Sequence, residues 1–152
     1  IGDCHCIVDG KYYDNPKPYE IPIAKKRAEI LKDALANGAT VEELRRNDIG
    51  RESVLPILKK ACKEQNKAYS VIDGFPIPLQ HVRVIKVKAP EAEIVLASDG
   101  YPRLMPTLRE SEKELECLLA EDPLCIGDNI ATKGLKVGQK SFDDRSYIRL
   151  TS

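Results

Sequence analysis

Two acidic segments of the sequence have the residue types and positions to bind a divalent cation. The first is "IVLASDG", residues 94–100, in which an apolar run leads directly into Asp99. The second is "SFDDRSYI", residues 141–148, which places Asp143 and Asp144 just before another apolar stretch. Magnesium and manganese prefer carboxylate and water oxygens, and they need few carboxylates from the protein. The pattern therefore predicts a hard-cation site, provided that the two segments meet.

The apolar run before Asp99 predicts a strand that is buried on both faces, because large aliphatic residues fill most of it. An aspartate at the tip of such a strand needs a partner, since an uncompensated buried charge is costly. A bound cation would be that partner. A simpler alternative stays open, because an aspartate at a strand end is also a common turn former through its side-chain hydrogen bond to the nearby backbone.

Length, charge and hydropathy exclude several classes of function. The chain has 152 residues, the size of one domain, and its 24 Lys and Arg balance 24 Asp and Glu. Without a basic excess, nucleic acid and anionic membranes are not expected as partners. No apolar run reaches the roughly 18 residues of a membrane span, and no signal peptide is recognisable. We therefore predict a soluble, cytoplasmic protein with a single domain over residues 1–152.

The cysteines indicate the redox environment of the protein, and the first residues indicate whether the sequence is a whole domain. Five cysteines, an odd number spread over different elements, predict reduced thiols rather than a disulfide framework. The chain opens on "IGDCHCIVDGKYY", which is strand-like sequence without an initiator methionine. We interpret the sequence as a fragment of a larger domain.

The remaining sequence predicts strands and helices that alternate along the chain. Asp9-Gly10 predicts a two-residue hairpin turn, since both residues tolerate positive φ. Ser53 is expected to cap a helix in which Pro56 occupies the first turn, and Thr107 or Ser111 to begin a later helix. Strands are expected at 1–8, 11–13, 68–73, 82–89, 93–97 and the last half of 142–150, and helices at 23–37, from 53 to 62 and after 107. Because these elements lack regular βαβ spacing, the predicted fold class is α+β.

Two basic clusters fall in the segments that predict helices. They are "KKR" at residues 25–27 and "RR" at residues 45–46. Lysine and arginine usually keep their charged ends in water along a helix face, so both clusters are interpreted as solvated surface. A phosphate-binding or partner-binding patch is the alternative.

Three short motifs, taken in order, resemble the C-terminal half of the metal-dependent phosphatases of the protein phosphatase 2C type. "IGDCHC", "EIVLASDG" and "SFDDRSYIRL" follow one another as "GDSR", "ilLaSDGl" and "DNiTvi" do in that family. The segment "DNPKPYEIPIAKKRAEILKDALANG" is similar to the family's "DHkp…E…RI…GG" stretch. The resemblance implies an antiparallel β-sandwich flanked by helices, which would be incomplete here.

Carried over residue by residue, the resemblance makes Asp99 and Asp143 ligands of the second metal in a dinuclear Mn²⁺ or Mg²⁺ centre. Asp3 matches an aspartate that helps to hold a third metal in some members. Asp144 takes the place of the family's Asn, and Arg103 stands where members with a third metal carry an acid. The family's other ligands belong to an N-terminal "DGxGG" segment, which does not occur in this sequence.

The resemblance implies hydrolysis of phosphomonoesters by a metal-activated water, with phosphoserine or phosphothreonine proteins as substrates. The fragment alone is expected to be inactive, with a missing N-terminal half or a partner chain completing the site. The metal hypothesis predicts that the carboxylates of Asp99 and Asp143 approach within about 3 to 5 Å. Two alternatives stay open: a non-catalytic phosphatase-like module that binds or regulates a partner, and an unrelated α+β domain in which these two acids lie far apart.

Overall fold

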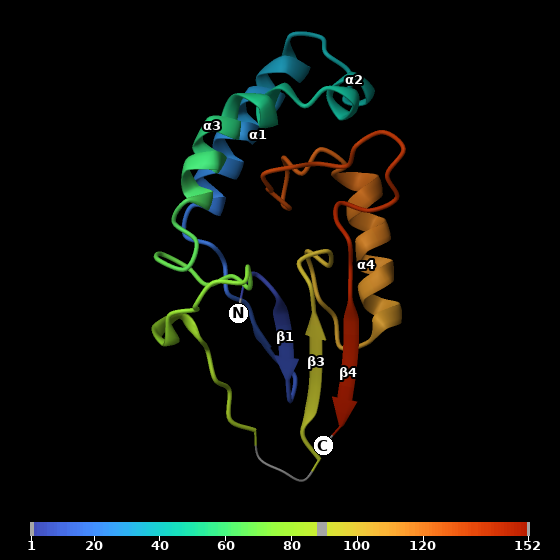
Figure 1. The fold of residues 1–152 in the computed structure, drawn as a ribbon. Helices are drawn as coiled ribbons and strands as arrows, with labels where there is room; N and C mark the ends of the chain where they lie inside the picture. The colour runs from blue at the N-terminus through green and yellow to red at the C-terminus, as the bar shows by residue number, and fades with distance from the viewer. Residues whose placement is uncertain (1, 88–90, 152) are drawn as a thin grey trace. The chain divides into compact units, whose positions relative to one another are not determined.

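A computed structural model describes residues 2–87 and 91–151 (Figure 1). The described chain has the predicted α+β composition, with one four-stranded antiparallel sheet in the order β2-β1-β3-β4. None of its described helices is both long enough and apolar enough to cross a membrane. The strands are β1 His5–Val8, β2 Lys11–Tyr13, β3 Glu93–Ala97 and β4 Tyr147–Thr151, and the helices are α1 Glu20–Ala36, α2 Val41–Arg46, α3 Ile49–Cys62, the 3₁₀ turn η1 Leu79–His81 and α4 Leu108–Glu121.

The residues pack into two compact units, which we describe separately. The first unit contains residues 1–17, 64–116 and 143–152, and therefore holds the sheet and most of α4. The second contains residues 18–63 and 117–142, with α1, α2, α3 and a long loop. The single domain over residues 1–152 stays a prediction.

The hairpin and the last two strands confirm the sequence interpretation. Asp9 and Gly10 have φ of 47° and 78°, as the turn between β1 and β2 requires. Strand β3 pairs with β1 on one side and with β4 on the other, antiparallel in both cases. The first predicted strand is shorter than expected, because β1 begins only at His5.

Strand β3 is buried on one face only, so the prediction of burial on both faces is wrong. Val95 and Ala97 are buried, whereas Leu96 between them is 42% exposed. The alternation is that of a sheet with one covered face, in which successive side chains point to opposite sides. Asp99, two residues beyond the strand, is exposed. The charge of Asp99 is therefore not buried, and it needs no bound cation to compensate for lost hydration.

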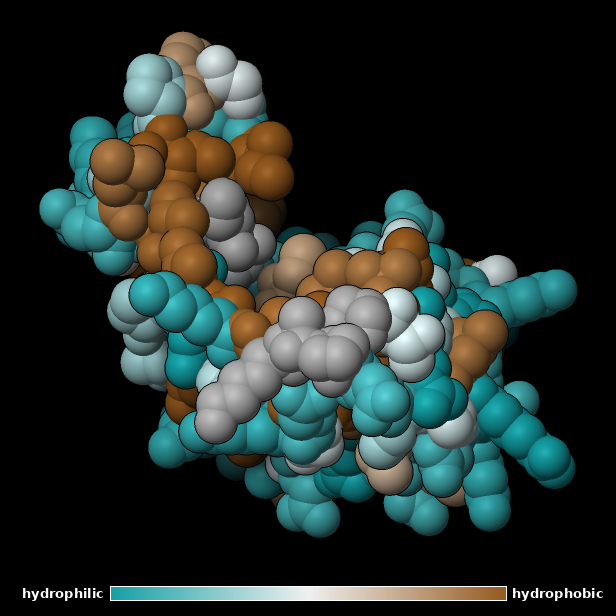
Figure 2. All heavy atoms as spheres, turned by 90° about the horizontal axis from the view of Figure 1, so that it is seen from below, coloured by the Kyte–Doolittle hydropathy of each residue, from teal (hydrophilic) through white to brown (hydrophobic). Residues whose placement is uncertain are grey.

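Two other predicted strands are not formed. Residues 68–73 show only an isolated bridge between Gln65 and Tyr69, and residues 82–87 are irregular; the end of the second prediction, 88–89, lies outside the described residues. Strand-prone sequence needs a neighbouring backbone to pair with, and over its described residues neither of these segments pairs with one of the four strands of the sheet. Between residues 72 and 84 several apolar side chains are exposed, namely those of Ile72, Phe75, Leu79 and Val84. Figure 2 shows hydrophobic residues, in brown, at the surface seen from below.

The structure tests the predicted caps and stops of three helices. Helix α3 begins at Ile49 with Asp48 as its N-cap, so the prediction that Ser53 caps it is wrong and Pro56 lies inside the helix. Helix α1 ends before Gly38, whose φ of 95° confirms the predicted stop. The side chain of Thr107 accepts a hydrogen bond from the backbone of Glu110, which confirms the first of the two predicted starts of α4.

Candidate functional site

The strand register brings the candidate acidic segments to one end of the sheet. His5 of β1 pairs with Ala97 of β3, and Ala97 pairs in turn with Tyr147 of β4. At this end β1 begins, β3 ends and β4 begins (Figure 1). The chain positions just beyond this row of paired residues therefore belong to three neighbouring strand tips, even though they are far apart in the sequence.

Asp3, Asp99 and Asp143 all lie beyond that row. Asp3 is two residues before β1, Asp99 is two residues after β3, and Asp143 is four residues before β4. Asp99 is exposed, and Asp3 and Asp143 are half-buried. The approach of the Asp99 and Asp143 carboxylates to within about 3 to 5 Å, the reach of two oxygens on one ion, stays a prediction.

Ser98 joins the tips of β3 and β4 directly. Its backbone N–H donates to the carbonyl oxygen of Ser146 at 3.1 Å, and its Oγ accepts from the N–H of Ser146 at 3.0 Å. The same hydroxyl donates to the carbonyl oxygen of Asp144 at 3.4 Å. These contacts continue the β3–β4 pairing for one residue beyond the strands, up to the acidic segments.

Gly100 explains why a glycine follows Asp99. A Cβ at this position would lie 2.3 Å from the carbonyl oxygen of Asp144 and 2.7 Å from Cβ of Arg145. Both distances are well inside ordinary contact, so only glycine lets the two backbones approach this closely. The "SDG" motif thus has a structural reason that the sequence alone did not show.

Glu112 of α4 links the residues that follow both acids. Its carboxylate accepts two hydrogen bonds from the guanidinium of Arg145, at 2.9 and 3.0 Å, and a third from the hydroxyl of Tyr101. The bond to Arg145 and then that to Tyr101 hold the pKa of Glu112 below its usual value. Burial, and secondarily the Glu112 carboxylate, raises the pKa of Tyr101. The sequence does not predict this cluster, because nothing in local spacing relates residues so far apart.

Asp3 and Asp99 both influence the imidazole of His5. Burial lowers the pKa of His5, and the charges of Asp14, Asp99 and Asp3 oppose that effect in decreasing order. Asp3 also forms an ion pair with Lys17, and His5 bonds to the hydroxyl of Tyr12. Both candidate ligands are therefore close enough to act electrostatically on one imidazole.

The donors at these tips fit a hard cation. Carboxylate oxygens are the ligands that Mg²⁺ and Mn²⁺ take, and one or two can suffice when water fills the other positions. Within residues 2–87 and 91–151, no group of three or more His, Cys, Asp or Glu side chains is arranged to hold a metal ion. An ion here would therefore need waters, or ligands from outside the described chain, to complete its coordination.

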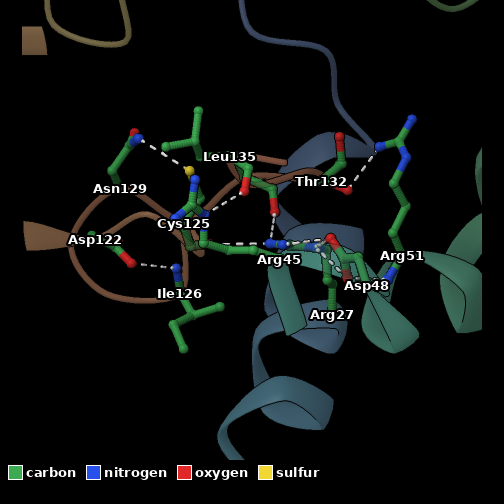
Figure 3. Close-up of polar contacts among 11 residues, drawn as sticks. Arg27, Arg45, Asp48, Arg51, Asp122, Cys125, Ile126, Asn129, Thr132 and Leu135 are labelled. Atoms are coloured by element: carbon green, nitrogen blue, oxygen red, sulfur yellow. Dashed lines mark hydrogen bonds and ion pairs between the residues drawn. The ribbon is translucent and has the colours of Figure 1, made fainter. Parts of the chain in front are cut away.

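A second polar cluster lies in the second unit, where the sequence analysis expected solvated surface. The side chain of Arg27 is fully buried, and its guanidinium donates to Asp48 through Nε at 3.0 Å and Nη2 at 2.7 Å (Figure 3). The remaining nitrogen, Nη1, donates to the carbonyl oxygens of Ala131 at 3.0 Å and Cys125 at 3.4 Å. The interpretation of Arg27 as a solvated residue is therefore wrong.

Neighbouring arginines extend this cluster along the loop 122–135. Arg45 donates to the carbonyl oxygen of Leu135 at 3.1 Å, and Arg51 to that of Thr132 at 2.8 Å (Figure 3). Arg46, by contrast, forms exposed pairs with Glu42, as a solvated position should. The three arginines satisfy backbone carbonyls of a polar loop, and this points to a structural role.

One signal in the sequence could have identified Arg27. The buried residues of α1 recur at helical spacing, at Ile23, Ala24, Arg27, Ala28 and Leu31. Arg27 thus stands in the middle of the apolar stripe, where a side chain that faces water is not expected. Its position on that stripe, rather than its membership of a basic cluster, predicts burial.

Comparisons with known proteins give this chain no relative. No family model, curated protein or solved structure matches it.

Proposed function

We propose that this chain supplies carboxylate ligands to the Mn²⁺ or Mg²⁺ centre of a phosphatase of the protein phosphatase 2C type, which hydrolyses phosphoserine or phosphothreonine in proteins. The observation that carries the proposal is the strand register, because it assembles three aspartate-bearing segments at one end of one sheet. In the proposed site Asp99 and Asp143 hold one cation together, and Asp3 lies at the next strand tip. The sheet would form one layer of the sandwich that the resemblance implies.

The chemistry of the donors supports this assignment. A divalent cation bound here would supply an acidified water as nucleophile and positive charge for the phosphoryl oxygens. The residues of this chain would orient and hold that ion, and no side chain of the chain is proposed as a covalent nucleophile. The exposure of Asp99 supports the proposal further, because a ligand at the surface can be reached by a phosphorylated protein.

Manganese binding by the chain itself tests the proposal. We expect Mn²⁺ titration, followed by electron paramagnetic resonance, to show binding that Asp99→Asn and Asp143→Asn each weaken at least about tenfold, because each removes a charged ligand. Asp128→Asn is the matched control, since it removes the same charge from an exposed position in the second unit. Equal affinity in all three variants would contradict the assignment.

Catalysis needs a second experiment, in a protein completed by the "DGxGG" segment that the resemblance implies. In that protein Asp99→Asn should abolish Mn²⁺-dependent hydrolysis of a small aryl phosphate while the circular dichroism spectrum stays unchanged. Unchanged turnover would exclude Asp99 as a ligand of the catalytic metal.

A non-catalytic module that binds a partner is the second candidate function, and one observation favours it. Leu96 of β3 lies opposite Ile148 of β4, and the adjoining Leu150 projects on the same face of the sheet. These three side chains are 42%, 50% and 45% exposed. Aliphatic residues that gather on one open sheet face are typical of an interaction surface. Failure of the chain to bind Mn²⁺ would favour this candidate.

A further inference from the structure

We infer that Glu112 is a positioning residue, which sets the spacing between the tips of β3 and β4 and thereby the separation of Asp99 and Asp143. The link to metal binding rests on the proposed function, whereas the effect on the two tips can be measured without it. Glu112 belongs to α4, not to the sheet, and it does not enter the ligand set. Its part is to hold two segments of backbone that carry ligands.

The contacts of Glu112 reach the segment after β3 and the segment before β4. Tyr101, which donates to Oε1, is two residues after Asp99. Arg145, which donates from Nε to Oε1 at 2.9 Å and from Nη2 to Oε2 at 3.0 Å, is two residues after Asp143. A single carboxylate therefore joins the segment after β3 to the segment before β4, at a point two residues from each acid. The two-pronged bond to Arg145 also fixes the orientation of the guanidinium, which one hydrogen bond would not do.

The frame that carries these contacts is itself well packed. Tyr101 is 3% exposed, and its ring meets that of Tyr147 edge to face, with centroids 6.1 Å apart. The hydroxyl of Tyr147 donates to the carbonyl oxygen of Pro106, just before α4. Ser111, the neighbour of Glu112, is fully buried and bonds to the backbone of Met105. Glu112 thus acts from a fixed point on the helix.

Precise spacing matters more to metal binding than to folding. Ligand oxygens must lie within about 0.2 Å of their ideal distances from an ion, and partners that orient ligands change metal affinity by about ten- to a hundredfold. The pair Glu112–Arg145, in contrast, has side chains that are 35% and 34% exposed, and pairs as exposed as this contribute little to stability. The two effects of removing the Glu112 charge can therefore be separated.

The test compares Glu112→Gln with Glu114→Gln in the same chain. Glu114 pairs with Arg103 at 2.7 Å, so its variant also breaks an ion pair on α4, but Arg103 belongs to the segment that follows β3 and not to the one that precedes β4. We expect Glu112→Gln to raise the Kd for Mn²⁺ about tenfold, with a melting midpoint within about 2 °C of the parent chain. Glu114→Gln should leave the Kd unchanged. An unchanged Kd in Glu112→Gln, or an equal rise in both variants, would overturn the inference.

Amide hydrogen exchange separates this inference from the proposed function. The N–H groups of Ser98 and Ser146 bond across the two tips, so they report on the spacing without any metal. Glu112→Gln should accelerate exchange at both groups by several-fold, and Glu114→Gln should not. If the parent chain binds no Mn²⁺, the proposed function fails, and accelerated exchange still supports the positioning role. Unchanged exchange at both serines overturns that role whatever the Mn²⁺ result.

Discussion

The two units use the same kind of ion pair in opposite surroundings. In the second unit the guanidinium of Arg27 meets Asp48 with its side chain fully buried and that of Asp48 only 15% exposed. In the first unit the guanidinium of Arg145 meets Glu112 with both side chains about one-third exposed. Each pair uses more than one nitrogen of the arginine and orients a loop. The two pairs differ in how much of their side chains solvent can reach.

The buried pair makes further hydrogen bonds inside the protein. Arg27 also donates to two carbonyl oxygens of the loop, and Asp48 also accepts from the N–H of Arg51 at 2.7 Å as the cap of α3. The exposed pair lies beside a strand end whose Asp99 reaches the surface. We conclude that the buried Arg27–Asp48 pair is suited to maintaining the fold. The exposed Arg145–Glu112 pair is suited to presenting groups at the surface.

Removal of Arg27 should give the largest effect. Arg27→Met retains much of the buried volume but leaves Asp48 without its cationic partner and removes the hydrogen bonds from Arg27 to the carbonyl oxygens of Ala131 and Cys125. We expect a loss of about 3 to 5 kcal/mol in the free energy of unfolding, the usual cost of breaking a buried ion pair by removing one partner. Urea unfolding followed by circular dichroism measures this loss.

Arg46→Met is the matched control for that experiment. The side chain of Arg46 is 69% exposed and pairs with Glu42 at 3.3 Å, so its removal should cost less than about 0.5 kcal/mol. Similar losses in the two variants would show that burial does not distinguish a pair that maintains the fold from an exposed one.

The next effect concerns the close approach at the strand tips. We expect Gly100→Ala to cost about 1 to 3 kcal/mol, because the new Cβ would meet the backbone of Asp144 and crowded sites carry penalties of that size. It should also shift the amide resonances of Asp144 and Arg145 in NMR spectra.

Gly138→Ala separates crowding from backbone strain. A Cβ at Gly138 meets no atom within 4 Å, but the φ of this residue is +85°, so its variant should cost only about 1 kcal/mol. It should leave the resonances of Asp144 and Arg145 in place. If both variants shifted these resonances alike, the tip spacing would not depend on Gly100.

Local patterns predicted the parts of the fold that local chemistry controls. The Asp9-Gly10 turn, the Thr107 cap and the stop at Gly38 each depend on residues within a few positions of one another. The predicted strand at 82–89 failed over 82–87 because a strand needs a partner from elsewhere in the chain, and sequence alternation does not supply one.

The candidate site also contains residues that local sequence predicts and residues that depend on distant contacts. Asp3, Asp99 and Asp143 are candidates that the sequence predicts, and all three lie beyond the same end of the sheet. The sequence does not predict Glu112, which reaches Arg145 across 33 positions of sequence. Tertiary contacts of this kind depend on how α4 lies against the sheet, and no periodicity within one element encodes that arrangement.

The smallest effect is a pH dependence that distinguishes the two units by their thiols. Burial raises the pKa of Cys125 to about 12 from an ordinary 9.0, so the folded chain keeps its proton in a range where the unfolded chain loses it. The free energy of unfolding should therefore be unaffected below pH 9 and should fall above it, by at most about 1.4 kcal/mol per pH unit. Urea unfolding between about pH 8 and about pH 10 measures this slope, and Cys125→Ala should remove it.

Cys6 of β1 provides the control from the first unit. Burial also raises the pKa of its thiol, but Cys6 is only half-buried, and the charge of Arg83 opposes the effect. Cys6→Ala should therefore change the slope less than Cys125→Ala does. Each comparison uses the difference between variant and parent at every pH, which cancels the titration of lysines and tyrosines common to both chains. Two outcomes would contradict this comparison: the fall in the free energy of unfolding with pH persists in Cys125→Ala, or it disappears equally in Cys6→Ala. Either would mean that Cys125 is no better shielded from water than Cys6.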